Sequence, residues 1–155
     1  MNGIMQWLWV LLLAMLPISE LRGAIPLAIG IYKLNPYISI PLIVLANFVP
    51  IPLILKFLGP VEGFLRRWKF WDKLMDRIFE HTRKKTKKSI ERWESLALIL
   101  FVAIPLPVTG AWTGSLAAYL FGLDFKKSLL CIFIGIVIAG AIVTTAVVAG
   151  MNWLL

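Results

Sequence analysis

The stretch MLPISELRGAIPLAIGIY (Met15–Tyr32) decides how this chain folds, because it sets two opposite charges, Glu20 and Arg22, in otherwise apolar sequence. An ionisable group at membrane depth costs about 2.5–3.5 kcal/mol or more, so it is expected mainly beside a partner, a water-filled cavity or a substrate. Pro17 and Pro26 flank the pair, and proline interrupts the hydrogen bonds of a regular helix. The stretch therefore predicts a transport or binding site built on broken helix.

The composition predicts an all-α integral membrane protein with a single domain, residues 1–155. The chain is 60% hydrophobic and 15% charged, with a mean hydropathy of +0.87. A soluble domain is about half apolar and about a quarter charged. Leu129–Ala149 contains no charge at all, so a soluble fold would have to hide a run long enough to cross a bilayer.

The charges are concentrated in one segment. Twelve of the sixteen basic residues and six of the eight acidic residues lie between Lys56 and Glu94. Basic segments beside membrane spans are typically cytoplasmic and face anionic lipid. We therefore expect a multi-pass protein of the cell (plasma) membrane with loop 60–95 in the cytoplasm, where lipid is contacted by Arg83, Lys84, Lys85, Lys87 and Lys88. No nucleic-acid-reading motif accompanies these charges, so nucleic acid is not an expected partner.

Two segments are long and apolar enough to span the membrane: Ile38–Leu58, kinked by its prolines, and Leu129–Ala149. Between them, residues 60–95 carry apolar residues at helical spacing with most charges off the apolar stripe. This pattern predicts an amphipathic helix on the membrane surface, with Pro60 in its first turn. Ile4–Leu16 is too short for an upright span, so it is either an interfacial helix or one arm of the segment that follows.

The two halves of the chain repeat one order: a short segment broken by Pro and Gly, a polar turn, and a longer span. The turn Leu34–Ser39 recurs as Leu123–Ser128. Paired interrupted segments at corresponding positions indicate a transporter site built on an inverted repeat. The sequence thus predicts two repeats, 1–59 and 96–155, joined by the surface helix. Each broken segment is expected to be a re-entrant hairpin, and the two tips are expected to meet near the midplane around a shared cavity.

Glu20 and Arg22 are the leading candidates for chemistry. Glu20 is expected to bind a proton or a cation, and Arg22 to anchor an anionic headgroup through its planar fork of donors. The alternative is a structural ion pair that holds the hairpin tip. Residues two apart do not share a helix face, so either the backbone is irregular here or each side chain has its own partner. A proton is the expected coupling ion, and no other cofactor is expected.

The second broken segment contains PLPVTGAWTG (Pro105–Gly114), which offers freed backbone groups, two hydroxyls and an indole. Broken helices can coordinate ions or anionic groups through backbone N–H and C=O groups. Its candidate residues for substrate or proton binding are Pro105, Pro107, Thr109, Gly110, Trp112, Thr113 and Gly114. The two glycines could instead serve only a tight turn and close packing, and Trp112 could be an interfacial anchor. Asn47, within the first span, is either a further ligand or an interhelical hydrogen-bonder.

Enzyme motifs are missing from the sequence. It contains no HExxH, no G-x-S-x-G and no Cys/His cluster. The one histidine, His81, lies in the charged segment, and Cys131 is the one cysteine. We therefore expect neither an enzyme nor a metal site.

ELRGAIP near the N-terminus, together with PLPVTGAWTG, resembles the family of small multidrug export proteins, which looks like a distant branch of the DedA/VTT membrane-protein superfamily. The resemblance covers nearly the whole chain. It implies paired re-entrant hairpins that move polyprenyl-phosphate carriers or other phospholipids, with proton coupling. By motif position it supports Glu20, Arg22 and Pro26 in the first hairpin, and in the second Pro105, Pro107, Thr109, Gly110 and Gly114. The DedA family proper usually has an arginine in the second motif, whereas Pro105–Gly114 has none.

Four functions follow as expectations, the last of them a small channel. The first is a transporter or flippase for an anionic amphiphile, in which Arg22 holds the headgroup and Glu20 exchanges a proton. The second is a proton-coupled exporter of cationic drugs, in which Glu20 is the substrate's counter-ion. The third, of another class, is a membrane adaptor that does not transport and acts through its basic amphipathic helix. Membrane lipid is an expected partner, and a homodimer is expected because two full spans leave the hairpins uncovered.

Overall fold

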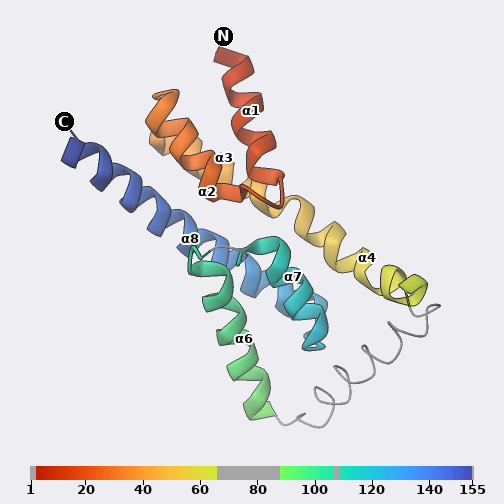
Figure 1. The fold of residues 1–155 in the computed structure, drawn as a ribbon. Coiled ribbons are helices and arrows are strands. Elements are labelled where there is room, and N and C mark those ends of the chain that lie inside the picture. The colour runs from red at the N-terminus through yellow and green to blue at the C-terminus, as the bar shows by residue number, and fades with distance from the viewer. Residues whose placement is uncertain (1–2, 66–87, 107–108, 155) are drawn as a thin grey trace.

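The computed structural model describes residues 3–65, 88–106 and 109–154, and all the regular structure in these ranges is helical. In chain order the helices are α1 (Gly3–Met15), α2 (Glu20–Ile25), the π-helix η1 (Pro26–Ile31), α3 (Pro36–Phe48), α4 (Pro50–Leu65), α6 (Lys88–Ala103), α7 (Ala111–Leu120) and α8 (Phe125–Leu154) (Figure 1). The all-α prediction is confirmed for the described part of the chain.

Two stretches are long and apolar enough to cross a bilayer, Pro36–Phe64 and Phe125–Met151. Their most apolar windows have only 33% and 39% of residues buried, so most of these apolar side chains face outward. A core helix of a soluble protein would be mostly covered, whereas a membrane span exposes this surface to lipid. The two predicted spans are thus confirmed as candidate membrane-crossing helices, and the first is interrupted between α3 and α4, where Pro50 begins the second helix.

Two element boundaries differ from the sequence prediction. Pro60 was expected in the first turn of a new helix, but it lies inside α4, which continues to Leu65. A proline removes one backbone N–H donor and crowds the preceding turn. These effects are local, and α4 continues past Pro60. In addition, α6 begins at Lys88, so the helix that enters the second half starts before residue 96. Most of the expected surface helix, residues 66–87, lies outside the described residues.

The turns before the two long helices share a backbone conformation. Lys33 has a φ of +53° and Gly122 a φ of +68°, which is the left-handed conformation that often ends a helix. Each is followed by a leucine and then by a capping residue. Asn35 accepts a hydrogen bond from the backbone N–H of Tyr37 (3.0 Å), and Asp124 accepts one from Lys126 (3.0 Å). The recurring sequence motif therefore builds the same helix start twice.

Both broken segments are pairs of helices joined by a short loop. In the first, α1 packs against α2 and α3, so Gly3–Met15 is an arm of this pair. In the second, α6 and α7 are joined by residues 104–110. The α1–α2 pair and the α6–α7 pair lie in opposite halves of the molecule, and their loops meet between them (Figure 1). The long helix α8 packs against members of both pairs.

Glycines allow the second pair to pack closely on α8. A Cβ atom at Gly114 of α7 would lie 2.5 Å from Val102 Cγ2, and one at Gly135 of α8 would lie 2.6 Å from Val102 Cβ. Val102 of α6, 1% exposed, therefore packs between two glycines, and a side chain at either position would force a neighbour to shift. Small residues of this kind permit close helix approach within membranes. This packing fixes where the loop between α6 and α7 lies.

Candidate functional site

Arg22 of α2 holds the loop between α6 and α7. Its Nη1 donates to the backbone oxygens of Leu106 (2.9 Å) and Thr109, and its Nη2 donates to the oxygen of Ile104 (3.3 Å) and to Thr109 Oγ1 (3.2 Å). The four N–H groups on the two terminal nitrogens match these four contacts, while Nε has no hydrogen-bond partner among the described residues. Charged hydrogen bonds contribute about 1.5–3 kcal/mol each. Arg22 thus crosslinks the two broken segments.

Glu20 contacts the start of α7, on the other side of the loop that Arg22 holds. Its side chain is 5% exposed, and Oε1 accepts a hydrogen bond from the backbone N–H of Trp112 in the first turn of α7 (3.2 Å). The backbone of Glu20 has a φ of +48°, a left-handed conformation that costs an L-residue about 1–2 kcal/mol. Strained residues of this kind gather at functional sites. The irregular backbone lets Glu20 and Arg22 reach separate partners although they are only two residues apart.

Gly110 is the position that lets the carboxylate approach α7. It has a φ of +156°, and a Cβ atom there would lie 2.6 Å from Glu20 Oε1 and also against Oε2. Real Cβ atoms essentially never lie so close to another heavy atom, so the carboxylate would have to move. Gly110 is therefore required by close approach and by backbone conformation, rather than only by a tight turn.

The two charges complement the two broken helix ends. The last carbonyl groups of a helix lack partners and carry partial negative charge, and the first N–H groups carry partial positive charge. Arg22 lies at the carbonyl groups that follow α6, and Glu20 lies at the N–H groups that begin α7. This arrangement offsets part of the cost of placing both ions in apolar surroundings.

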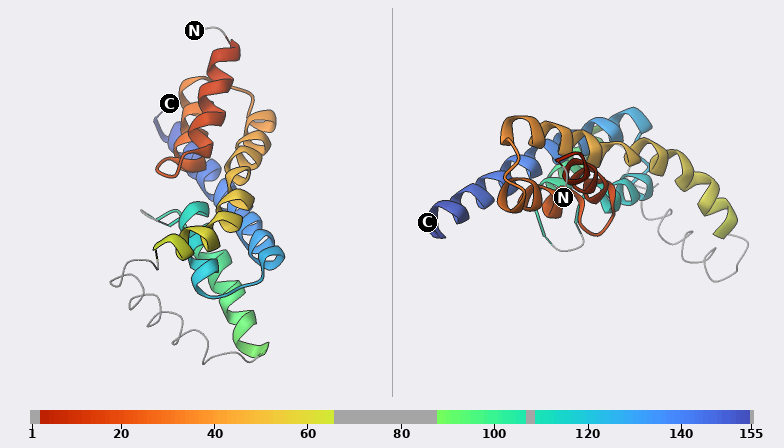
Figure 2. Two further views of the ribbon diagram at one scale, coloured as in Figure 1. Left: turned by 90° about the vertical axis from the view of Figure 1, so that its right-hand side faces the viewer. Right: turned by 90° about the horizontal axis from the view of Figure 1, so that it is seen from above.

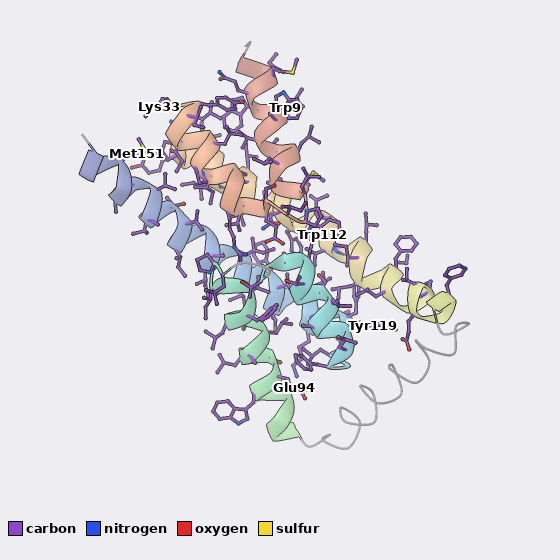
Figure 3. The ribbon with its side chains drawn as sticks, in the orientation of Figure 1. Trp9, Lys33, Glu94, Trp112, Tyr119 and Met151 are labelled. Carbon is purple, nitrogen blue, oxygen red and sulfur yellow. The ribbon has the colours of Figure 1, made fainter. Side chains whose placement is uncertain are left out.

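Further hydrogen bonds fix the first loop. Trp112 Nε1 donates to the backbone oxygen of Met15 (3.2 Å), and Ser19 Oγ donates to the oxygen of Leu13 (2.6 Å). Trp112 therefore contacts the first broken segment through both its backbone and its indole. Figure 3 shows it at the centre of the molecule, between the two helix pairs.

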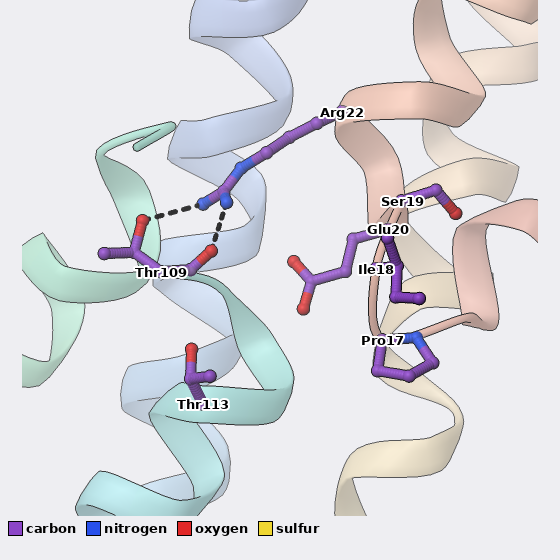
Figure 4. Close-up of a pocket in the computed structure, with 7 residues that line it drawn as sticks. All are labelled: Pro17, Ile18, Ser19, Glu20, Arg22, Thr109 and Thr113. Carbon is purple, nitrogen blue, oxygen red and sulfur yellow. Dashed lines mark hydrogen bonds between the residues drawn. The ribbon is translucent and has the colours of Figure 1, made fainter. Parts of the chain in front are cut away.

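A cavity of about 270 Å³ lies between the loops. It is lined by Pro17, Ile18, Ser19, Glu20, Arg22, Thr109 and Thr113 (Figure 4). The first loop and the start of α2 supply the Glu20 carboxylate and the Arg22 guanidinium, and Thr109 and Thr113 lie opposite Glu20 (Figure 4). Pro17 and Ile18 are the apolar lining residues. The cavity offers an acceptor for a proton or a cation, with an apolar surface beside it.

The structure brings together four of the residues singled out in the sequence: Glu20, Arg22, Thr109 and Thr113 line one cavity. Gly110 and Trp112 adjoin it through Glu20. Gly114 instead packs against Val102, which fits the alternative that this glycine serves close helix packing. Pro26 begins the π-helix η1, and Pro105 is exposed on the loop.

Asn47 stands apart from the residues that line the cavity. It is fully buried on α3, and neither its Oδ1 nor its Nδ2 has a hydrogen-bond partner in the described part of the chain. The expectation that it bonds between helices therefore has no support from the described contacts. A buried amide without partners is costly and needs an explanation.

Several candidates lie outside the described residues. These are Pro107 and the basic residues Arg83, Lys84, Lys85 and Lys87; Lys88 begins α6, but its side chain is not described.

Three cavity residues were missed in the sequence, namely Pro17, Ile18 and Ser19. Their signal was their place immediately before Glu20, in a loop that a proline opens. In the sequence, Pro17 indicates only that the helix is broken. The structure shows that the loop it opens also lines the cavity.

Long apolar helices whose side chains mostly face outward make this an integral membrane protein. A family model matches residues 20–142, which include the charged pair and the loop between α6 and α7. The chain belongs to the family described as "Putative small multi-drug export protein", and the predicted resemblance is confirmed at this level. The description names a transporter rather than an enzyme. Neither a curated protein nor a solved structure matches the chain significantly.

Proposed function

We propose that this protein is a proton-coupled membrane exporter of cationic amphiphiles, with Glu20 as the group that binds proton and substrate in turn. The observation that carries the proposal is a carboxylate, 5% exposed, on the wall of a cavity between two broken segments. A carboxylate in such surroundings is costly, and ionisable groups kept at membrane depth typically mark a proton, ion or substrate site. Export is also what the family's description names.

The proposed membrane placement follows from the ends of the helix pairs. Lys33 and Glu94 lie at opposite ends of the molecule, with Trp112 between them (Figure 3). We place these ends at the two membrane surfaces, so that each helix pair is a re-entrant hairpin and the two form an inverted repeat. The end with Glu94 is the cytoplasmic one in a plasma membrane, because the chain between α4 and α6 carries most of the basic residues and the positive-inside rule favours that side for them.

The hydrogen bonds of Arg22 favour a cationic over an anionic substrate. Each terminal nitrogen of the guanidinium already donates twice, to oxygens of the second loop. A phosphate would have to displace these carbonyl groups and leave them unpaired, which is costly. The Glu20 carboxylate accepts from the backbone at the start of α7, including the N–H of Trp112, and it also lines the cavity. An ionised carboxylate has about four acceptor positions, so acceptor capacity remains toward the cavity.

Coupling follows from the chemistry of one carboxylate. Glu20 can hold a proton or attract a cation, but a protonated carboxyl no longer attracts the cation. A proton entering from one side would therefore release the substrate, and deprotonation toward the other side would restore the site. The apolar rim at Pro17 and Ile18 suits the hydrophobic part of an amphiphile.

The test is transport by purified protein in liposomes under a pH gradient, with ethidium as the lipophilic cation. Glu20→Gln keeps the shape and the acceptor for Trp112 but removes the charge, and we expect it to abolish ethidium transport. Glu94→Gln, the same change outside the cavity, is the control and should transport as the wild type does. Full ethidium transport by Glu20→Gln would refute the proposal, and so would pH-independent transport by the wild type.

A second candidate, transport of an anionic amphiphile of the polyprenyl-phosphate or phospholipid type, has one observation in its favour. Arg22 lines the cavity, and its Nε donor has no partner in the part of the chain that the structure describes. The resemblance to the DedA superfamily points the same way. The assay is movement of fluorescent phosphatidylglycerol across the same liposomes. Loss of this movement in Arg22→Ala, with ethidium transport absent in the wild type, would favour the second candidate.

A further inference from the structure

Buried side-chain polar atoms that lack a hydrogen-bond partner among the described residues lie on three helices. They are Arg22 Nε on α2, Ser39 Oγ and both amide atoms of Asn47 on α3, and Thr144 Oγ1 on α8. These three helices pack against one another. A buried polar group without a hydrogen bond is costly, and such groups are normally satisfied by protein or by an ordered water molecule. The three helices therefore enclose more hydrogen-bonding capacity than the described side chains use.

The hydroxyl groups of Ser39 and Thr144 differ from that of a neighbouring residue. A serine or threonine hydroxyl within a helix can donate to the carbonyl oxygen one turn earlier. Thr145 does so, to the backbone oxygen of Ala141 (2.8 Å). Ser39 Oγ and Thr144 Oγ1 are buried and make no such bond to the described residues. Both hydroxyl groups are therefore available to another partner between the helices.

These two hydroxyl groups lie at about the same level of the contact between α3 and α8. The helices are antiparallel, since the start of α3 and the end of α8 lie at the same end of the molecule (Figure 1 and the left view of Figure 2). A Cβ atom at Gly140 of α8 would lie 3.2 Å from Val44 Cγ2 of α3. Toward the shared end, Ser39 is five positions from this contact on α3 and Thr144 is four positions from it on α8. Both are therefore about one helical turn beyond it.

The polar atoms also lie at successive depths between one membrane surface and the cavity. Ser39 is in the first turn of α3, at the end of the molecule that the proposed placement assigns to the outer surface. Asn47 follows eight positions later on α3, a rise of about 12 Å toward the middle of the membrane. Arg22 lines the cavity that the Glu20 carboxylate also lines. The polar atoms thus extend from the outer end of α3 toward Glu20.

We propose that these side chains form the route by which protons pass from the outer membrane surface to Glu20, carried by water molecules that enter between α2, α3 and α8. The inference rests on the proposed function, in which Glu20 takes up a proton. Hydroxyl and amide side chains can each donate and accept, and buried water typically binds about three such groups. Each water molecule in the chain passes one proton on and receives another, as in other water-mediated proton transfers. The Glu20 carboxylate gains the last proton.

The first test compares two adjacent threonines of α8. Thr144→Val removes the unpartnered hydroxyl, whereas Thr145→Val removes one that is bonded within its own helix. Ethidium transport is measured in liposomes under a pH gradient, and ethidium binding is measured at equilibrium without a gradient. We expect Thr144→Val and Ser39→Ala to slow transport several-fold with unchanged binding, and Thr145→Val to match the wild type. Thr144→Ser, which keeps a hydroxyl, should restore the rate.

Two results of this comparison would overturn the proposal. One is transport at the wild-type rate by both Thr144→Val and Ser39→Ala. The other is an equal loss of transport in Thr144→Val and Thr145→Val, because the effect would then not depend on the unpartnered hydroxyl.

A second measurement detects water directly and uses no substrate. Cys131, the one cysteine, is first replaced by alanine. Ser39→Cys and Ser115→Cys are then compared for reaction with silver ions, which reach a thiol only through water. Both serines are 0% exposed, but the Ser115 hydroxyl is bonded to Ala111 within α7. We expect the thiol at position 39 to react several times faster, and equal rates would contradict the route.

The outcomes separate the route from the proposed function. Loss of transport in Glu20→Gln, together with wild-type transport by Ser39→Ala and Thr144→Val, would leave the exporter intact and remove only the route. Full transport by Glu20→Gln would remove the proposed function, and with it the destination of the proton.

Discussion

Arg22 and Thr109 lie 87 positions apart in the sequence and are joined by two hydrogen bonds, one from Nη1 to the backbone oxygen of Thr109 and one from Nη2 to its hydroxyl. The contact ties the first turn of α2 to the residue that precedes Gly110 and α7. The positions of the two loops therefore depend on one another. A displacement of either loop changes the cavity between them.

Replacing Arg22 by lysine keeps the positive charge but loses the fork of donors. A single ammonium group cannot reach all four oxygens that Nη1 and Nη2 contact. We expect a loss of about 1.5–3 kcal/mol in stability for each charged hydrogen bond that is not replaced. Thermal unfolding in detergent, followed by tryptophan fluorescence, measures the effect. The control is Lys56→Arg at an exposed position, and an equal melting temperature for both variants would contradict the crosslinking role.

Gly110→Ala should disrupt the site without touching either charge. The added Cβ would lie 2.6 Å from Glu20 Oε1, on a residue whose φ of +156° disfavours side chains. The carboxylate would have to leave the N–H of Trp112. We expect both a lower melting temperature and loss of ethidium transport. Gly63→Ala is the matched control because nothing lies within 4 Å of its Cβ. Wild-type behaviour of Gly110→Ala would show that Glu20 need not approach α7.

Gly135→Val tests the packing that positions the second loop. A Cβ there would lie 2.6 Å from Val102 Cβ and 3.0 Å from the backbone oxygen of Ile99, so α6 and α8 would have to separate. Overpacking of this kind costs about 1–3 kcal/mol. The same substitution at Gly150, also on α8 but with open space around it, should leave the melting temperature unchanged. Equal melting temperatures of the two variants would argue against the close approach of α6 and α8.

Asn47→Leu should separate stability from function. The amide is fully buried, and neither Oδ1 nor Nδ2 has a partner among the residues that the structure describes. An unsatisfied buried polar group costs about 1–3 kcal/mol. We expect the leucine variant to be as stable as the wild type or more stable, and to transport ethidium more slowly, because a costly amide implies a use in another step of transport. Asn35→Ala, which removes a helix cap, should instead lose about 1 kcal/mol. A clear loss of stability in Asn47→Leu would mean that the amide is bonded in the working protein.

Much of the fold could be predicted from local properties of the sequence. The length of the apolar runs gave the two long helices, and Pro17 and Gly110 marked loops that the structure contains. The recurring turn motif is present in both halves, and the structure adds that Asn35 and Asp124 cap the helices that follow. The boundary at Pro60 was wrong because a proline in an otherwise favourable helix removes only one donor, and the flanking turns continue.

The sequence by itself determined that this is a membrane protein with two apolar spans, two broken segments and a charged pair beside one break. Each of these is a property of neighbouring residues: hydropathy, proline and glycine content, and the cost of burying charge. Only the tertiary structure decided what the charges contact. Arg22 and Glu20 reach residues more than 80 positions away, and that contact depends on Val102 fitting against Gly114 and Gly135 so that α6, α7 and α8 present the second loop to the first. Local patterns carry no information on such distant packing.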